Sequence, residues 1–348
     1  MEKPLNGVKI VEFEGLGPAP FAAMALSDMG AEVICIGRKP PQAPAIWLDR
    51  DRDFRVLDLK SEAGRQAALD LIARADVLIE GFRPGKMEAL GLGPVEAFAV
   101  NPALIYGRMT GWGQEGPLTG MAGHDLNFLA MTGLLSLMGH RDRPPTPPLN
   151  LVSDFGGGGM YLAFGIACAL LKARLTGEGA VIDAAMVHGT SHLATFVHGR
   201  RVQGGWSDGR EANALDGGAP FYRVYACAEG GWMAIAAVEP QFWTNAVAVL
   251  GLPPEFVAWQ GERNHWPAMI AAVTERFASR SRQDWEAAFA GVDACVTPVL
   301  SVDEAVRHPQ VGRYFDWLGP VARPKPAPVL TRAPGAWRAP RSKGPSSD

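Results

Sequence analysis

Two patterns of hydrophobic and polar positions alternate along the first 110 residues of the chain. Residues 21–30 and 61–75 have the spacing of amphipathic helices, and Ser61 stands at the expected N-cap of the second helix. Strands that alternate with helices predict a parallel, Rossmann-like α/β sheet. Four short apolar runs are typical of its buried strands: residues 8–13, 31–37, 75–82 and 103–111.

Two longer apolar segments follow. Residues 126–138 predict one helix, and a second helix is expected from Asp154 and its four glycines to about Thr176. The most apolar part of the second helix, residues 160–171, is shorter than the ~20 residues that a membrane-spanning helix needs. We therefore expect a buried core helix with a buried, inert Cys168 and no membrane association.

The same pattern divides the chain into a large and a small domain joined by long linkers. Residues 1–189 are expected to form the large Rossmann-like domain, and the looser polar sequence at 190–215 is typical of a linker. Residues 216–310 contain two strand signals, FYRVYAC and WMAIAAV, followed by amphipathic helices, which predicts a smaller α+β domain. Residues 311–348 are rich in proline and predict an extended arm that returns to the large domain.

Composition narrows the functional class. With 33 Lys and Arg residues against 36 Asp and Glu residues, the net charge is -3, so no global basic field attracts nucleic acid or an anionic membrane. The start of the chain has no cationic end before an apolar run, and we expect no signal peptide. The four cysteines form no CxxC pair, which favours a cytoplasmic protein without disulfides or a structural zinc site.

Asp154 is the most informative candidate side chain. An aspartate before four glycines and an apolar helix is most simply an N-cap, whose carboxylate accepts backbone N–H bonds. Backbone without side chains would also let a ligand approach a helix N-terminus, where N–H groups stabilise negative charge. An aspartate held there is a candidate base or nucleophile. The local sequence leaves both interpretations open.

The other candidates are unspecific when each is taken alone. His124 and Glu239 are unremarkable as single residues. His188 and His192 are four apart on a predicted helix, but no third ligand is near them in the sequence, and we expect no metal site. Three cations follow predicted strands, where α/β sheets bind phosphate-rich ligands: Arg38, Lys60 and Arg83.

A series of short motifs runs through most of the chain, and the series as a whole is much more specific for a protein family than any single residue in it. In chain order they are DMGAEVI, DLK, GFRPG, LGLGP, MTGWGQEGP, GHDLNF, PPLNLVSDFGGGGM, IDAAMV, NALDGGAPFY and VEPQFW. Their order and spacing resemble the alpha-methylacyl-CoA racemases of the third CoA-transferase family. The resemblance implies an acyl-CoA substrate with coenzyme A as its handle, and no metal or redox cofactor.

The resemblance also implies roles for the candidate residues. His124 and Asp154 would be the two acid–base groups that remove and return the proton beside the thioester. Glu239 would orient the histidine and stabilise its cationic form. Asn150 and the backbone at Asp125 would lie near the reacting thioester. The three cations that follow the strands would line the CoA channel.

Two other functions are compatible with parts of this pattern. A CoA-transferase on the same fold would use Asp154 as a covalent CoA carrier, so Asp154 alone does not distinguish the two enzymes. His124 and Glu239 favour the racemase, because they supply a second base and its orienting partner. A non-catalytic acyl-CoA-binding protein would need none of these three side chains.

The resemblance finally implies an interlocked homodimer, with each active site between one subunit's large domain and the other's small domain. His124 and Asp154 would then lie on one chain and Glu239 on the other. The chain differs from its family at two places. Ala89 stands where racemases carry an arginine before LGLGP, with Lys86 nearby, and lysine is not equivalent to arginine at phosphates. The sequence also ends without the helix that usually closes the large domain, which is expected to weaken the dimer.

Overall fold

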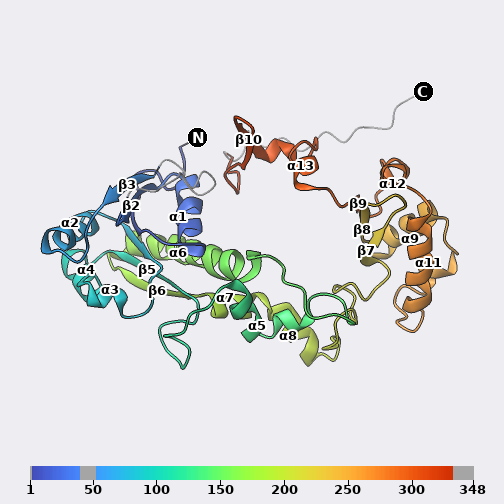
Figure 1. Cartoon of the computed structure of the whole chain (residues 1–348), viewed down its shortest axis with the longest axis horizontal. Helices are drawn as coiled ribbons and strands as arrows, with labels where there is room; N and C mark the ends of the chain where they lie inside the picture. The colour runs from blue at the N-terminus through green and yellow to red at the C-terminus, as the bar shows by residue number, and fades with distance from the viewer. Residues whose placement is uncertain (1, 40–51, 332–348) are drawn as a thin grey trace. The chain divides into compact units, whose positions relative to one another are not determined.

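A six-stranded sheet is the centre of the first part of the chain (Figure 1). The computed structural model of the chain describes residues 2–39 and 52–331. The strand order is β3-β2-β1-β4-β5-β6 and all neighbouring strands are parallel, which confirms the expected Rossmann-like sheet. The strands are β1 (Lys9–Phe13), β2 (Glu32–Gly37), β3 (Asp53–Val56), β4 (Val77–Glu80), β5 (Ile105–Thr110) and β6 (Ala180–Ala185).

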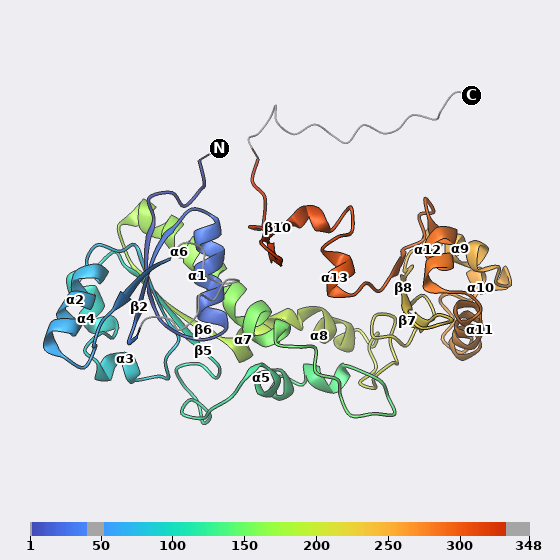
Figure 2. The ribbon, with the colours of Figure 1, turned by 45° about the horizontal axis from the view of Figure 1, so that its top comes forward.

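Helices cover both faces of this sheet, as Figures 1 and 2 show. Helices α1 (Pro18–Asp28) and α6 (Tyr161–Thr176) pack on the face of Ile10, whereas α2 (Glu62–Ile72), α3 (Lys86–Ala89) and α4 (Pro94–Val100) pack on the opposite face. Successive side chains of a strand point to opposite faces, so the central strands contribute residues to a hydrophobic core on each face of the sheet. The sequences of these strands are therefore continuous apolar runs. Ser61 caps α2 as expected, with its side chain accepting from the N–H of Gly64.

The helix around the glycine run differs from its prediction. It begins at Leu151 with π-helical turns (Leu151–Met160) and continues as α6. One side of α6 packs on β5, β6 and α1, while an apolar stripe on its other side is exposed: Phe164 (69%), Leu171 (65%) and Leu175 (79%). Cys168 is exposed on the same helix. The expectation of a buried Cys168 was therefore wrong, and in the single chain the predicted core helix is buried only on the side of Leu162, Ile166 and Leu170.

This helical segment also bears on the membrane question. Among the described residues, Leu151–Thr176 is one helix long and apolar enough to cross a membrane by length and composition. A core helix of a soluble domain passes the same test, and here one side of α6 packs against the sheet, so the length and composition carry little weight.

The predicted helix at 126–138 is interrupted. Helix α5 (Asp125–Met131) is followed by Gly133 in the left-handed region (φ 81°) and by a 3-10 turn at Leu134–Leu137. A left-handed glycine ends a helix because it turns the backbone away from the helical path. The stretch expected as a linker is partly helical, since α7 (Met186–Leu193) leads into α8 (Thr195–Val202).

The chain forms two compact units. Among the described residues, the first comprises 2–39, 52–128, 150–190 and 314–331, and the second comprises 129–149 and 191–313. In the second unit, the strands β7 (Tyr222–Ala226), β8 (Trp232–Ala236) and β9 (Val296–Pro298) form an antiparallel sheet. Trp243, Trp266 and Trp285 are buried in its core. The remaining helices of this unit are α9 (Pro240–Leu250), α10 (Glu255–Ala258), α11 (Trp266–Ala278), α12 (Arg282–Phe289) and α13 (Val302–Ala305).

A short hairpin occupies the start of the expected proline-rich arm. Strands β10 (Phe315–Leu318) and β11 (Val321–Pro324) pair antiparallel. Residues 332–348, where a closing helix was expected to be missing, lie outside the described residues.

Candidate active site

A cavity of about 590 Å³ lies at the carboxyl ends of β1, β4 and β5, entirely within the first unit. Its walls come from residues 16–18 after β1, residues 81–84 after β4 and residues 109–112 at the end of β5. His124, Asn150 and Asp154 also line it, together with residues 119 and 121–123, Phe128 and Met186. Parallel α/β sheets bind ligands at this edge, so three residues that the sequence singled out meet where the fold favours a site.

Asp154 is positioned by the side chain of Asp125. The backbone N–H groups of Ser153 and Asp154 both donate to Asp125 Oδ1, each with an N···O distance of 2.7 Å. Asp125 is buried (4% exposed), so this contact is held away from solvent. Asn150 Nδ2 donates to Asp154 Oδ2 over 3.5 Å. The N-cap interpretation of Asp154 was wrong, because the helix begins earlier and Asn150 occupies the N-cap position.

Burial raises the pKa of the Asp154 carboxyl, and the negative charge of Asp125 raises this pKa further. The hydrogen bond from Asn150 and the charge of His124 act in the opposite direction. A carboxylate with a raised pKa is a stronger base when ionised and is closer to exchanging protons near neutral pH.

His124 stands at the start of α5. Its backbone N–H donates to Asn127 Oδ1 (3.1 Å), and its carbonyl accepts from the N–H groups of Asn127 (2.8 Å) and Phe128 (3.2 Å). The first turn of the helix therefore fixes the backbone of His124, while its side chain is exposed to the cavity.

Trp112 and Phe128 shape the wall that leads to His124, and sequence reasoning did not single them out. Their rings meet edge to face with centroids 4.8 Å apart, and Trp112 Nε1 donates to the carbonyl of Met121 (3.1 Å). A Cβ atom at Gly111 or Gly123 would lie 2.2 Å or 2.7 Å from the Phe128 ring. The available signal was the motif MTGWGQEGP, in which one tryptophan stands between glycines.

The turn EGLGPAP contributes to the same cavity. Gly17 has a φ of 68°, in the region that favours glycine, and an ideal Cβ there would lie 3.6 Å from Asp154 Oδ2. This turn thus brings the backbone before α1 close to the Asp154 carboxylate.

The glycines after Asp154 have a packing role. A Cβ at Gly157 would lie 2.7 Å from the backbone nitrogen of Thr190, and one at Gly159 would lie 2.9 Å from the carbonyl of Pro18. These buried glycines let α7 and α1 pack closely on the π-helical turns. The expectation that they open a helix end to a ligand was wrong for Gly157, Gly158 and Gly159, because neighbouring helices occupy that space.

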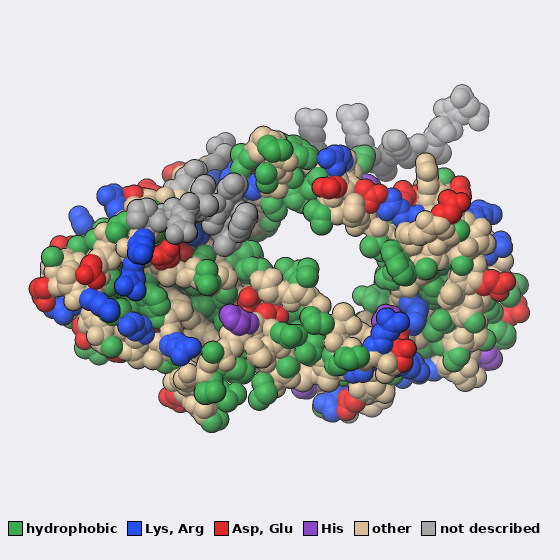
Figure 3. All heavy atoms as spheres, viewed as in Figure 1, with side chains coloured by type: hydrophobic (Ala, Val, Ile, Leu, Met, Phe, Trp, Pro, Cys, Tyr) green, Lys and Arg blue, Asp and Glu red, His purple; other side chains and the backbone are tan. Residues whose placement is uncertain are grey.

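The three cations are distributed along the carboxyl edge of the sheet. Arg83 lines the cavity, whereas Arg38 after β2 and Lys60 after β3 are exposed and do not line it. Figure 3 shows blue Lys and Arg side chains over the region of α2, α3 and α4 on this unit. Lys86 and Ala89, at the two ends of α3, are also exposed and outside the cavity lining.

Glu239 belongs to the second unit. It is the N-cap residue of α9 and its side chain is exposed. The cavity of the first unit therefore contains His124 and Asp154 without Glu239. Within the described ranges, no group of three or more His, Cys, Asp or Glu side chains could hold a metal ion, and His188 and His192 lie on α7.

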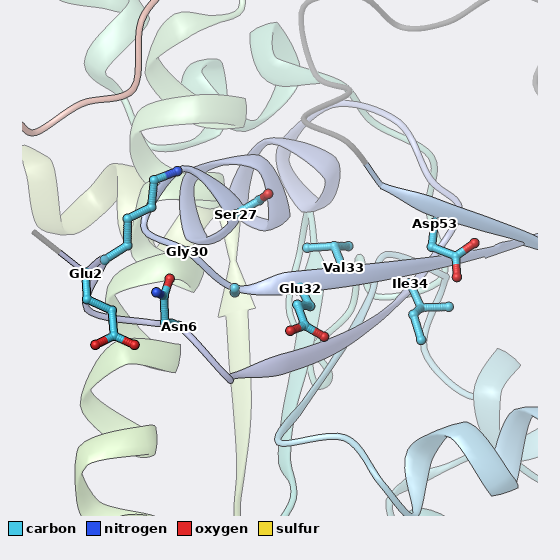
Figure 4. Close-up of a pocket in the computed structure, with 10 residues that line it drawn as sticks. Glu2, Asn6, Ser27, Gly30, Glu32, Val33, Ile34 and Asp53 are labelled. Atoms are coloured by element: carbon cyan, nitrogen blue, oxygen red, sulfur yellow. The ribbon is translucent and has the colours of Figure 1, made fainter.

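A second cavity of about 710 Å³ lies at the opposite edge of the sheet (Figure 4). Glu32 at the start of β2, Asp53 at the start of β3 and Glu2 line it, together with Lys3. Three carboxylates against one amine suit a phosphate-rich ligand poorly. The carboxyl-edge cavity is the better candidate site, although it is the smaller of the two.

The first unit is a parallel α/β domain that places a histidine and a carboxylate at the carboxyl edge of its sheet. The second unit is small and contains an antiparallel sheet. The chain belongs to CoA-transferase family III, which it matches over residues 5–337.

Its similarity to known proteins extends over nearly the whole chain. It is 43% identical over 333 residues to the alpha-methylacyl-CoA racemase of Mus musculus and 42% identical to that of Homo sapiens; each comparison covers 95% of this chain and 87% of the relative. The solved structure of a CaiB/BaiF family protein from Brucella suis superposes with a TM-score of 0.80 at 26% identity. That comparison covers 95% of this chain and 93% of the other.

Proposed function

We propose that the protein is an isomerase that inverts the α-carbon of 2-methylacyl-CoA thioesters. The observation that carries the proposal is the shared cavity of His124 and Asp154, in a chain 42–43% identical to two proteins named alpha-methylacyl-CoA racemase. Inversion requires removal of the α-proton from one face and delivery of a proton to the other, and two side chains can divide these steps.

The two side chains exchange roles with direction. In one direction the neutral imidazole of His124 takes the α-proton, the electron pair moves into the thioester carbonyl, and the protonated carboxyl of Asp154 delivers a proton to the opposite face. In the other direction the Asp154 carboxylate is the base and the imidazolium is the acid. The raised pKa of Asp154 supports this exchange, since the carboxyl is protonated more readily than an exposed aspartate.

The enolate intermediate needs hydrogen-bond donors at its oxygen. The N–H groups of Ser153 and Asp154 already donate to Asp125, so they are committed to holding the helix turn. We propose that the enolate oxygen accepts hydrogen bonds from the amide of Asn150, which lines the cavity, and from the backbone N–H of Asp125, the residue that follows the cavity-lining His124.

Coenzyme A serves as the handle of the substrate, and these proton transfers need no metal or redox cofactor. Arg83 in the cavity wall would meet the CoA phosphates first, with Arg38 and Lys60 further along the same edge of the sheet. Arginine and lysine at strand ends supply the positive potential that concentrates such an anion.

A homodimer would complete the site. Phe164, Leu171 and Leu175 form an exposed apolar stripe on α6, and contiguous apolar surface of this kind marks a protein contact. Glu239 lies on the second unit, outside the cavity that holds His124. We propose that the second unit of each chain brings Glu239 to the His124 of its partner, where the carboxylate orients the imidazole.

A CoA-transferase is the second candidate function. Asp154 lies in the cavity at a position suited to attack a thioester and carry CoA covalently. That reaction does not use a second base on the opposite side of the substrate, and His124 would have no role in it.

Isotope exchange separates the two reactions. The purified protein is incubated with one epimer of a 2-methylacyl-CoA in deuterated water, and α-deuterium incorporation and loss of chirality are followed together. A parallel reaction offers free carboxylic acids as CoA acceptors. The racemase incorporates α-deuterium and forms both epimers; CoA transfer without α-exchange would overturn the assignment. Binding with neither reaction would identify an acyl-CoA-binding protein.

A further inference from the structure

A buried ion pair lies beside the cavity on the face of α2, α3 and α4. Glu80 at the end of β4 and Arg108 on β5 face each other across the parallel register, and Arg108 Nε donates to Glu80 Oε1 (3.1 Å). Glu80 is 1% exposed and Arg108 is 7% exposed, and neither lines the cavity. A charge pair removed from water is costly unless it is fully hydrogen-bonded, so its other contacts indicate what it does.

Those contacts hold one loop. The backbone N–H of Phe82 donates to Glu80 Oε2 (2.7 Å), and Arg108 Nη2 forms an ion pair with Glu88 Oε1 on α3 (2.9 Å). At the far end of the same loop, the hydroxyl of Tyr106 on β5 donates to the carbonyl of Leu92 (3.0 Å). Side chains of β4 and β5 thus fix the beginning, the middle and the end of residues 81–93.

The loop carries part of the proposed CoA site. Residues 81–84, including Arg83, line the cavity, and Gly85 follows with a φ of 80°. A loop with glycines on both sides of Arg83 would lose conformational entropy when it binds a phosphate. The contacts of Phe82, Glu88 and Leu92 order the loop before the ligand binds, so this entropy cost is not part of the binding free energy.

We propose that Arg108 is a positioning residue: through Glu80 and Glu88 it holds residues 81–93 so that Arg83 faces the CoA phosphates. The inference rests on the proposed use of CoA and adds a residue that never touches it. A purely structural role for the buried pair would lower stability and weaken all ligands alike, whereas positioning acts on the phosphate-bearing part of the ligand.

The test measures CoA binding by calorimetry for the wild type, Arg108→Met, Arg83→Gln and the double variant. Arg108→Met is expected to weaken CoA binding about tenfold, because the phosphate contact must order the loop itself. In the Arg83→Gln background the same change should have almost no effect, since the residue through which it acts is gone. Additive losses in the double variant, or unchanged CoA affinity in Arg108→Met, would overturn the proposal.

A phosphate-free ligand sharpens the comparison. The KM of an acyl-pantetheine thioester, which lacks the nucleotide, should be equal in wild type and Arg108→Met; an equal rise for both substrates would indicate a structural role. If Arg108→Met does not fold, Glu88→Gln removes only the partly exposed end of the network (side chain 43% exposed) and should weaken CoA binding by a smaller factor. Unchanged CoA affinity in Glu88→Gln would then count against the proposal.

Two controls complete the design. Arg74→Met removes an exposed arginine at the end of α2, where its Nε donates to the carbonyl of Asp70, and CoA affinity should be unchanged. The second control measures α-proton exchange by the wild type independently of CoA binding. CoA binding without exchange would reject the racemase function but not the positioning role of Arg108. A wild type that does not bind CoA would overturn both proposals.

Discussion

The carboxylate of Asp125 accepts a hydrogen bond from the backbone N–H of Asp154, with an N···O distance of 2.7 Å. The same oxygen accepts from Ser153, and the other oxygen of Asp125 is buried without a hydrogen-bond partner among the residues described. One carboxylate therefore fixes the backbone of the candidate catalytic carboxylate and also places a second negative charge beside it. Geometry and acid–base behaviour at Asp154 are coupled through this one contact.

Asp125→Asn separates the two effects. The amide oxygen can still accept from both N–H groups, but the negative charge is gone, and the pKa of Asp154 should fall because Asp125 is one of the causes that raise it. The acidic limb of the pH profile for α-proton exchange should shift to lower pH, while exchange at high pH is largely retained. The control is Asp76→Asn, which alters a carboxylate that accepts the N–H of Lys9 at the amino edge of the sheet. An acidic limb that does not move would contradict the coupling.

The packing role of the glycine run predicts an asymmetric response to alanine. Gly157→Ala places a Cβ 2.5 Å from Thr190 Oγ1 and 2.7 Å from the Thr190 nitrogen, so α7 must move. Overpacking of this kind costs about 1–3 kcal/mol in the free energy of unfolding. Gly199→Ala on exposed α8 has nothing within 4 Å and should stabilise the helix slightly. Chemical denaturation of both variants measures the difference, and equal stability of the two would show that α7 does not press on Gly157.

Glu80 predicts a pH dependence of stability. Burial raises the pKa of Glu80 to about 7, against the lowering effects of the Phe82 N–H and of Arg108. A carboxyl whose pKa is raised in the folded state contributes stability below its ordinary pKa of 4.5 and loses it as the pH rises through about 7. Glu80→Gln lacks this titration. The stability of the wild type relative to Glu80→Gln should therefore fall by up to about 3 kcal/mol between pH 4.5 and pH 8.

The control for this measurement is Glu304→Gln. The hydrogen bonds from Arg282 and Ser301 lower the pKa of Glu304 to about 2, so its contribution changes only below pH 4.5. The difference between wild type and Glu304→Gln should be flat over the same range. A flat difference for Glu80→Gln as well would show that Glu80 keeps one protonation state throughout.

Much of the fold could be predicted because its signals are local. The apolar runs of β1, β4 and β5 reflect burial on both faces, and Ser61 caps α2 through a contact within four residues. The exposure of Cys168 could not be predicted, because α6 carries apolar residues on all its sides, and hydrophobic periodicity then does not indicate which side faces the sheet. The motif order identified the family because it samples the entire chain.

The contacts of the candidate site could be predicted only in part. His124, Asn150 and Asp154 line one cavity, as their motifs suggested, and their catalytic roles stay predictions. The hold of Asp125 on Asp154 spans 29 residues, and the glycine run packs on segments before and after it in the sequence. Such partners depend on tertiary structure and leave no periodic signal. The prediction that Glu239 joins this site stays a prediction, since Glu239 lies in the other unit.

A dimer whose sites combine two chains predicts complementation between inactive variants. His124→Ala removes one base, and Glu239→Gln removes the proposed orienting carboxylate on the second unit, so each variant alone should lose most racemisation. Co-expression with two different tags allows mixed dimers to form before the chains are isolated by tandem purification. In a two-fold symmetric mixed dimer, one site receives both altered residues and the other receives His124 and Glu239 intact, which should restore about half of the wild-type activity.

If each site instead used both residues from a single chain, both sites of the mixed dimer would carry one altered residue and activity would not recover. Asp154→Ala combined with His124→Ala is the matched control, because both residues line the cavity of one chain and their mixed dimer should stay inactive.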